Sequence, residues 1–187
     1  MWLWVGELEI LHAVRTAVLS PTATVFGMLT LSMTKETKLV ACFESALFIP
    51  DLRATDRLQA LEEMVDSLYE NGRVKDKALV LEMLRRREIL GSTGIGKGIA
   101  IPHGRTLAAP ELSILFGRTS RGIDFDALDN KPVHLFFVIV APPHDRSNIY
   151  LPVLGRIVEK VKESRMRQKL MKVENFDELK KVFLADA

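Results

Sequence analysis

Cysteine is nearly absent from this chain of 187 residues. Cys42 is the single example, which excludes an intramolecular disulfide and a cysteine-rich metal site. Such sparing use of cysteine is typical of a reducing compartment, so we expect a cytoplasmic protein. Histidines and carboxylates also lack metal-ligand spacing, and we expect neither a metal nor another cofactor.

An excess of charge of one sign is lacking as well. Lys and Arg total 26 against 24 acidic residues, which leaves a formal net charge of +2. This balance gives no signal for nucleic-acid or membrane-surface binding, so any electrostatic preference for a partner must come from a local patch. Length and a hydrophobic content of 48% fit one soluble domain of ordinary size.

Long hydrophobic runs are missing too, even in the apolar first 30 residues. Glu7, Glu9 and Arg15 interrupt the run of about 20 residues that a membrane span needs, and no basic start precedes it as in a secretory signal. Met33, followed by Thr-Lys-Glu-Thr-Lys, resembles an ordinary start. We therefore expect residues 1–32 to be an N-terminal extension, either an extra element or a wrongly assigned start, without stable membrane insertion.

Apolar spacing farther along the chain predicts two helices before the glycine-rich segment. Asp56 with Gln59 has the spacing of a capping box, and Asn71-Gly72 is a stop signal. A second helix is expected at about residues 75–87, ending in three arginines. Its predicted buried residues are Leu79, Val80, Met83 and Leu84.

The second half of the chain alternates strand and helix patterns. Residues 112–117 are typical of a buried strand, and residues 133–140 are almost all β-branched or aromatic, as in a central strand covered on both faces. Helical spacing resumes at Tyr150, at about residue 164, and after Asn175, which has Glu178 at the capping-box spacing. The chain is therefore predicted to be an α/β domain with helices on both faces of its sheet.

General folding requirements do not explain the segment GSTGIGKGIAIPHGR, residues 91–105. Its alternate glycines permit backbone conformations closed to other residues and let amide groups approach an anion. These are Gly94, Gly96 and Gly98. Pro102 and Gly104 then flank His103. The segment thus indicates an exposed imidazole beside a candidate anion-binding loop.

A nucleotide-binding loop is the first alternative for this segment. Gly91-x4-Gly96-Lys97 matches G-x-x-x-x-G-K-[ST] except at the last position, where Gly98 replaces the magnesium-binding hydroxyl. Such a loop also follows a strand and opens a helix, whereas here a helical pattern precedes it and Pro102 blocks helix formation. We therefore do not favour nucleotide binding.

The run from Arg87-Glu88 through the glycines to I-A-I-P-H-G resembles the signature of the type 2 (mannitol/fructose-type) enzyme IIA domain of the bacterial phosphoenolpyruvate-dependent phosphotransferase system. It is most similar to the stand-alone nitrogen-regulatory branch. The resemblance covers residues 38–187 and implies that family's fold, a mixed β-sheet flanked by helices on both faces. It also implies a cytoplasmic phosphocarrier without a cofactor.

The resemblance assigns roles to particular residues. His103 corresponds to the phosphoryl acceptor, and Arg87, sixteen residues earlier, to the arginine that stabilises the phosphate charge. The amides near Gly94, Gly96 and Gly98 are expected to bind phosphate. Arg85 and Arg86 are expected to be ordinary cations at a helix C-terminus.

The other histidines need separate interpretation. The family usually has a second active-site histidine forty-seven residues after the first, where this chain has Tyr150. A phenol can donate a hydrogen bond to a ring nitrogen or phosphate but does not titrate near neutrality, and His144 is an alternative substitute. His134, inside the predicted central strand, is expected to be a hydrogen-bonded structural residue.

Two functional classes follow from the resemblance. As a transport component, the protein would take a phosphoryl group from a histidine-containing phosphocarrier protein and pass it to a separate enzyme IIB. As a regulator of the nitrogen branch, its phosphorylation state would select target proteins. A third alternative is a binding-only regulator that has lost transfer because of Tyr150. We favour regulation and expect a shallow apolar docking surface around His103.

Overall fold

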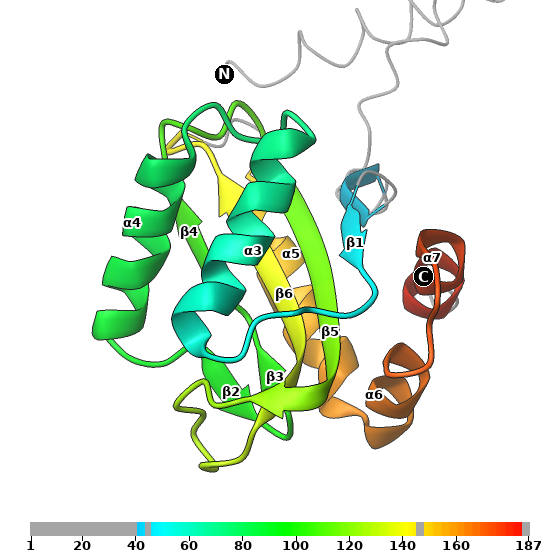
Figure 1. The fold of residues 1–187 in the computed structure, drawn as a ribbon. Helices are drawn as coiled ribbons and strands as arrows, with labels where there is room; N and C mark the ends of the chain where they lie inside the picture. Colours follow the sequence, from blue (N-terminus) through cyan, green and yellow to red (C-terminus); the bar gives the residue numbers. More distant parts are fainter. Residues whose placement is uncertain (1–40, 44–45, 145–147, 185–187) are drawn as a thin grey trace, which may run out of the picture. The chain divides into compact units, whose positions relative to one another are not determined.

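The computed structural model describes residues 41–43, 46–144 and 148–184, so the predicted extension at residues 1–32 lies outside the described residues. In the described part, a six-stranded sheet of mixed direction carries helices on both faces (Figure 1). The predicted α/β class with a mixed sheet is confirmed.

Strand β6 organises the sheet. The order is β1-β5-β6-β3-β2, and β4 also pairs with β6. Strands β3 and β4 both run parallel to β6, with Ile99 opposite Leu135 and His103 opposite Ile139. They therefore follow one another along one edge of β6. The strands are β1 Leu47–Ile49, β2 Gly94–Gly96, β3 Ile99–Ala100, β4 His103–Arg105, β5 Ser113–Ile123 and β6 Val133–Ala141.

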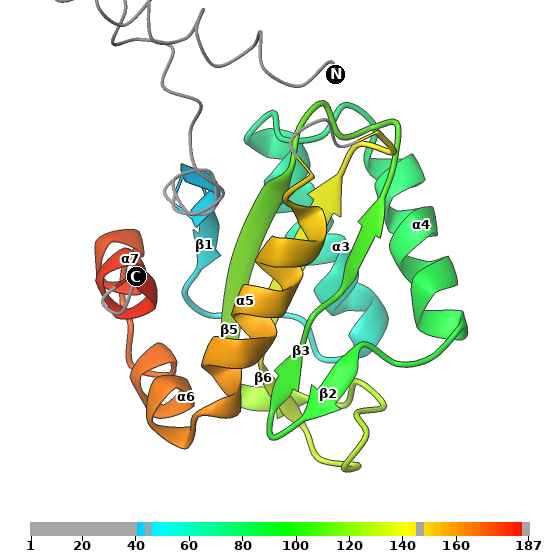
Figure 2. The same ribbon diagram turned by 180° about the vertical axis from the view of Figure 1, so that it is seen from behind.

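Side chains of β6 alternate between two separate cores. Leu135, Phe137 and Ile139 belong to the core covered by α5, α6 and α7, and the residues between them belong to the core under α3 and α4. Figure 2 shows α5 lying across the face of the sheet opposite to α3 and α4. The helices are α3 Arg57–Glu70, α4 Lys77–Ile89, α5 Tyr150–Lys162, α6 Ser164–Leu170 and α7 Phe176–Leu184. The prediction of a central strand covered on both faces is confirmed.

Side-chain caps fix the start of three helices. Asp56 accepts a hydrogen bond from the amide of Gln59 at 2.9 Å, and Asn175 accepts one from the amide of Glu178 at 3.0 Å, as predicted. Asp76 caps α4 in the same way, through the amide of Leu79 at 3.0 Å. The first amides of a helix have no partner within the helix, so these side-chain bonds determine the residue at which each helix begins.

Two details differ from the prediction. Val80 and Leu84 are buried as expected, but Leu79 is 43% exposed and Met83 only half-buried. These two side chains lie one turn apart on a stripe beside the sheet-facing one, so the helical spacing alone did not distinguish the stripes. Strand β5 also continues to Ile123, past the predicted end at residue 117, because polar residues near its end conceal the strand pattern.

Candidate functional site

His103 is the first residue of β4, and the backbone holds its ring in one tautomer. The distance from Nδ1 to the carbonyl oxygen of Ile101 is 2.6 Å. A carbonyl oxygen can only accept a hydrogen bond, so Nδ1 must carry the proton. In the neutral ring, Nε2 therefore carries the lone pair and is the nucleophilic nitrogen.

The surroundings of His103 favour the neutral ring. Burial lowers the pKa of the imidazole below its usual value, and the charge of Arg87 lowers the pKa further. The hydrogen bond to Ile101 and the carboxylate of Glu88 act in the opposite direction but do not outweigh burial. At neutral pH the ring is consequently uncharged and able to attack an electrophile.

His103 is among the residues that line a groove of about 360 Å³ between β4 and α4. The apolar side chains of Leu79, Met83 and Leu90 line it, and Leu90 is 85% exposed. Cationic side chains also line it, namely Arg86, Arg87 and Arg105. The groove thus combines an apolar floor with positive charge beside the nucleophile, which agrees with the docking surface expected from the sequence.

Arg87 differs from its two arginine neighbours in its contacts. Arg86 pairs with Glu82 at 2.6 Å, and Arg85 pairs with Glu62 at 2.9 Å. Arg87 instead donates from Nη1 to the carbonyl oxygen of Gly91 at 2.8 Å while lining the groove with His103. Among the described residues no carboxylate pairs with Arg87, and its positive charge acts on both His103 and Tyr150.

Tyr150 opens α5 and lies beside the histidine. The centroids of the two rings are 6.4 Å apart, with the ring planes at 48°. Burial raises the pKa of the phenol above its usual value, although the charges of Arg105 and Arg87 act to lower it. The hydroxyl is therefore protonated at neutral pH and is a potential hydrogen-bond donor.

Arg105 is a residue to which the sequence analysis gave no role. Its guanidinium carbon lies over the Tyr150 ring, 4.9 Å from the centroid, and its Nη1 donates to the carbonyl oxygen of Pro143 at 2.9 Å. Strand periodicity was the sequence signal that could have indicated a role for Arg105. His103 and Arg105 are two residues apart and share one face of β4, whereas Gly104 faces Met83 on the other.

The three glycines of the loop form a hairpin and do not line the groove at His103. A Cβ at Gly94 would lie 2.8 Å from the Cα of Ala127, and φ is +82° at Gly96 and +78° at Gly98. These contacts and angles explain why glycine occupies each position, without any role in phosphate binding. Their predicted role in phosphate binding stays a prediction.

Hydrogen bonds tie this hairpin to its neighbours. The amide of Lys97 donates to Asp129 at 2.8 Å, and the amide of Thr93 donates to the buried carboxylate of Glu88 at 3.0 Å. The Thr93 hydroxyl donates to the same carboxylate. These bonds connect the end of α4, where Arg87 also lies, to the residue that precedes β2.

Two other histidines are described. The Nδ1 of His134 lies 3.1 Å from the carbonyl oxygen of Thr119, which confirms the prediction of a hydrogen-bonded strand residue. His144 is exposed in the segment after β6 and does not line the groove. Among the described residues, no cluster of three or more histidine, cysteine or acidic side chains could hold a metal ion.

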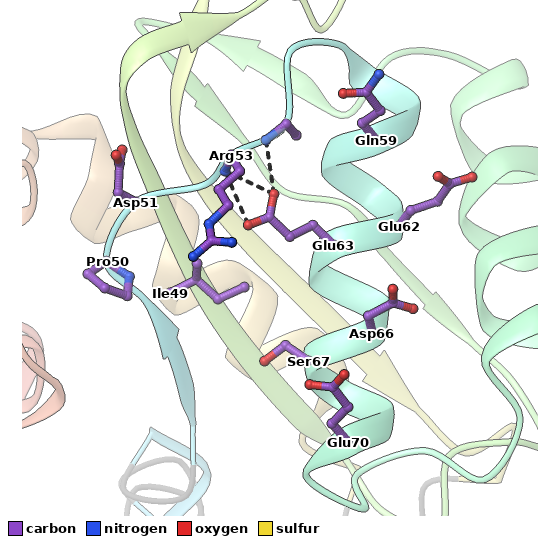
Figure 3. A pocket seen from close by; sticks show the side chains of 11 residues that line it. Ile49, Pro50, Asp51, Arg53, Gln59, Glu62, Glu63, Asp66, Ser67 and Glu70 are labelled. Carbon is purple, nitrogen blue, oxygen red and sulfur yellow. Dashed lines mark hydrogen bonds between the residues drawn. The ribbon is translucent and has the colours of Figure 1, made fainter.

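A second hollow, of about 670 Å³, runs along α3 and is lined by several carboxylates (Figure 3). Most of these carboxylates already have protein partners, among them Glu62, which pairs with Arg85. Glu63 accepts hydrogen bonds from the amides of Arg53 and Ala54 at 3.0 Å, and Asp66 pairs with Lys77 at 2.6 Å. The chemistry of this hollow is that of an ordinary charged surface, so the groove at His103 is the stronger candidate site.

Known proteins of one family are similar to this chain. The family model described as "Phosphoenolpyruvate-dependent sugar phosphotransferase system, EIIA 2" matches residues 41–185. The "Nitrogen regulatory protein" of Bradyrhizobium diazoefficiens is 35% identical over 122 residues, covering 65% of this chain and 78% of that protein. In the described part of the chain, no helix is long and apolar enough to cross a membrane.

A transport protein and a solved structure are similar as well. The "PTS system fructose-specific EIIABC component" of Bacillus subtilis is 34% identical over 127 residues, which are 68% of this chain but only 20% of that protein. The crystal structure of nitrogen regulatory protein IIA-Ntr from Neisseria meningitidis superposes with a TM-score of 0.67 at 34% identity, covering 74% of this chain and 93% of the other.

Proposed function

Because the chain belongs to the EIIA 2 family of the phosphoenolpyruvate-dependent phosphotransferase system, we propose that it is a phosphoryl carrier in which His103 is the acceptor. The observation that carries the proposal is the neutral imidazole with Nε2 as its nucleophilic nitrogen, at a groove beside Arg87. The donor is a histidine-containing phosphocarrier protein. Residues 38–187 form the functional domain.

Transfer needs little beyond positioning and charge. The Nε2 lone pair attacks phosphorus, the new N–P bond forms as the N–P bond of the donor breaks, and that electron pair returns to the donor's ring. The proton on Nδ1 remains there. The carbonyl of Ile101, 2.6 Å from Nδ1, stabilises the positive charge that the ring acquires in this step.

Arg87 and Tyr150 supply the stabilising groups for the phosphoryl oxygens. The guanidinium of Arg87 offers several N–H donors in a planar fork that matches a phosphate. The Tyr150 phenol, kept protonated by burial, offers a neutral donor. Because the phenol does not change its charge near pH 7, transfer does not depend on the titration of a second imidazole at this position.

We place the protein in the nitrogen-regulatory branch, where phosphorylation of His103 selects target proteins. Similarity to the IIA-Ntr structure and the sequence between Arg87 and Gly104 support this choice. Transport is the alternative, since the fructose-specific relative has the same 34% identity to this chain. In that case the acceptor is a separate enzyme IIB.

The test is phosphoryl transfer from labelled phosphoenolpyruvate through enzyme I and the carrier protein. We expect acid-labile, base-stable label on the wild type and none on His103→Ala. Arg87→Met should lower the transfer rate about 100-fold, as for other groups that stabilise phosphoryl charge. His144→Ala is the matched control and should take up label normally. Label on His103→Ala, or none on the wild type with a competent carrier, would refute the proposal.

The branch is tested with the labelled protein itself. Passage of label to a purified fructose-type enzyme IIB would favour transport. Retention of label, with binding to a target protein that differs between the phosphorylated and unphosphorylated forms, would favour regulation. A wild type that binds such a target but never takes up label would indicate the binding-only alternative, with Tyr150 as the first residue to examine.

A further inference from the structure

Arg105 joins three parts of the chain at the groove. It extends from β4 two residues after His103, its guanidinium lies over the Tyr150 ring, and its Nη1 bonds the carbonyl oxygen of Pro143. Pro143 lies two residues after the end of β6, and Tyr150 is the first residue of α5. The Arg105 side chain thus links β4, which carries His103, to both of these positions.

Arg105 contacts the first residue of α5 from another element. Tyr150 is that residue, and the guanidinium carbon of Arg105 lies 4.9 Å from the centroid of its ring. The bond from Nη1 to the carbonyl oxygen of Pro143 holds the same guanidinium from a second side. Arg105 is therefore placed to restrain the Tyr150 ring where α5 begins.

We propose that Arg105 is a positioning residue for phosphoryl transfer, which holds the Tyr150 ring in place beside His103. This inference rests on the function proposed above. An arginine suits the task because its planar guanidinium can lie over an aromatic ring while its N–H groups bond a carbonyl oxygen. A lysine keeps the charge but cannot maintain both contacts with the same geometry.

Arg105 acts through Tyr150, whereas Arg87 acts on both rings. The charges of Arg105 and Arg87 both lower the pKa of Tyr150, and the charge of Arg87 also lowers the pKa of His103. Because Arg105 contacts the Tyr150 ring, its loss should leave the His103 imidazole in place and release the phenol. The expected defect is slower transfer within the complex.

The first experiment measures transfer from the phosphorylated carrier as a function of carrier concentration. Arg105→Met should lower the rate at saturation about 10-fold, and Arg105→Lys should recover only part of the loss. Arg165→Met is the control, because it removes an exposed cation of α6 that does not line the groove. It should leave both the saturated rate and the apparent KM for the carrier unchanged.

A double-mutant cycle tests whether Arg105 works through the phenol. In the Tyr150→Phe background the hydroxyl is gone, so Arg105→Met should lower the saturated rate less than 3-fold. An equal loss in both backgrounds would mean that Arg105 acts independently of Tyr150 and would overturn the inference. So would a wild-type saturated rate in Arg105→Met.

A second experiment requires no transfer. The chain has 2 tyrosines, so in a Tyr69→Phe background ultraviolet titration follows Tyr150 alone. Arg105→Met should raise the pKa of Tyr150, because a cation that favours the phenolate is lost. If the wild type takes up no label, the proposed function fails, but this titration still reports the contact. An unchanged pKa in Arg105→Met would refute the contact on which the inference rests.

Discussion

At the scale of the residue, the environment of one imidazole determines what the site can do. A ring nitrogen serves as a phosphoryl acceptor only when it carries a lone pair. The bond from Nδ1 to Ile101 places the lone pair of the neutral ring on Nε2, and burial, which lowers the pKa of the ring, favours that neutral form. Local sequence contributes the first of these, since Ile101 lies two residues before the histidine.

The lowered pKa predicts a pH profile. Transfer to His103 should remain at its plateau as pH falls to about 6.5, the usual histidine value, and should decline only at lower pH. Arg87→Met removes a charge that lowers the pKa, so the pKa of His103 should rise. NMR titration of the 4 histidines measures this, with His103→Ala used to assign the signal.

The same pKa shift affects stability with a definite sign. The unfolded imidazole has the higher pKa, so the unfolded state binds more protons as pH falls below about 6.5. The contribution of His103 to stability is therefore fully present above that pH and is lost on acidification toward its folded pKa. A folded-state pKa above 6.5, or one that Arg86→Met alters as much as Arg87→Met, would contradict this account.

At the scale of the element, the groove depends on close contact between α4 and β4. Gly104 lets them approach, because a Cβ there would lie 1.9 Å from the sulfur of Met83. Met83 in turn lines the groove beside His103. The glycine after the histidine is thus explained by helix packing on the face of β4 opposite to the His103 and Arg105 side chains.

This contact predicts the effect of Gly104→Ala. The overlapping atoms of Met83 are the end of a flexible, half-buried side chain that can move, so overpacking should destabilise the protein by about 1 kcal/mol, the low end of the usual range, measured by urea unfolding. In a Met83→Ala background the added methyl group finds space, so most of this loss should disappear. Gly155→Ala is the control. Nothing lies within 4 Å of its added Cβ, so this substitution should not destabilise the protein. Equal losses in both Met83 backgrounds would show that packing against Met83 is not the cause.

At the scale of the whole molecule, sequence patterns predicted the elements better than their meeting points. Local signals identified the caps at Asp56 and Asn175 and the buried strand β6. They did not reveal that Leu79 is exposed along the groove, because neighbouring helix stripes have the same apolar spacing. Which stripe of α4 is exposed depends on the position of β4 beside it, and the spacing of apolar residues does not specify that position.

The site shows the same limit. Resemblance predicted His103, Arg87 and Tyr150 as site residues. The structure places the ring centroids of His103 and Tyr150 6.4 Å apart, and Arg87 lines the same groove as His103. Resemblance could not reveal Arg105, whose partners Pro143 and Tyr150 are 38 and 45 residues away in the sequence. Such contacts depend on the pairing of β4 with β6, which local patterns do not specify.

The division of the chain gives the last prediction. The family match spans residues 41–185, and residues 1–32 are predicted to be a separate extension. On that division, a chain that starts at Met33 should unfold with a free energy within about 0.5 kcal/mol of the full chain, the range for changes that touch no core contact. Its m-value should also be unchanged, since m scales with the surface exposed on unfolding.

Urea unfolding of the two chains, with labelling of His103 in each, makes the comparison. A smaller m-value for the shortened chain would mean that residues 1–32 bury surface with the domain, which would contradict the division. An unchanged m-value with slower labelling would instead assign those residues to partner docking. Equal stability and equal labelling would restrict both the fold and the chemistry to residues 33–187.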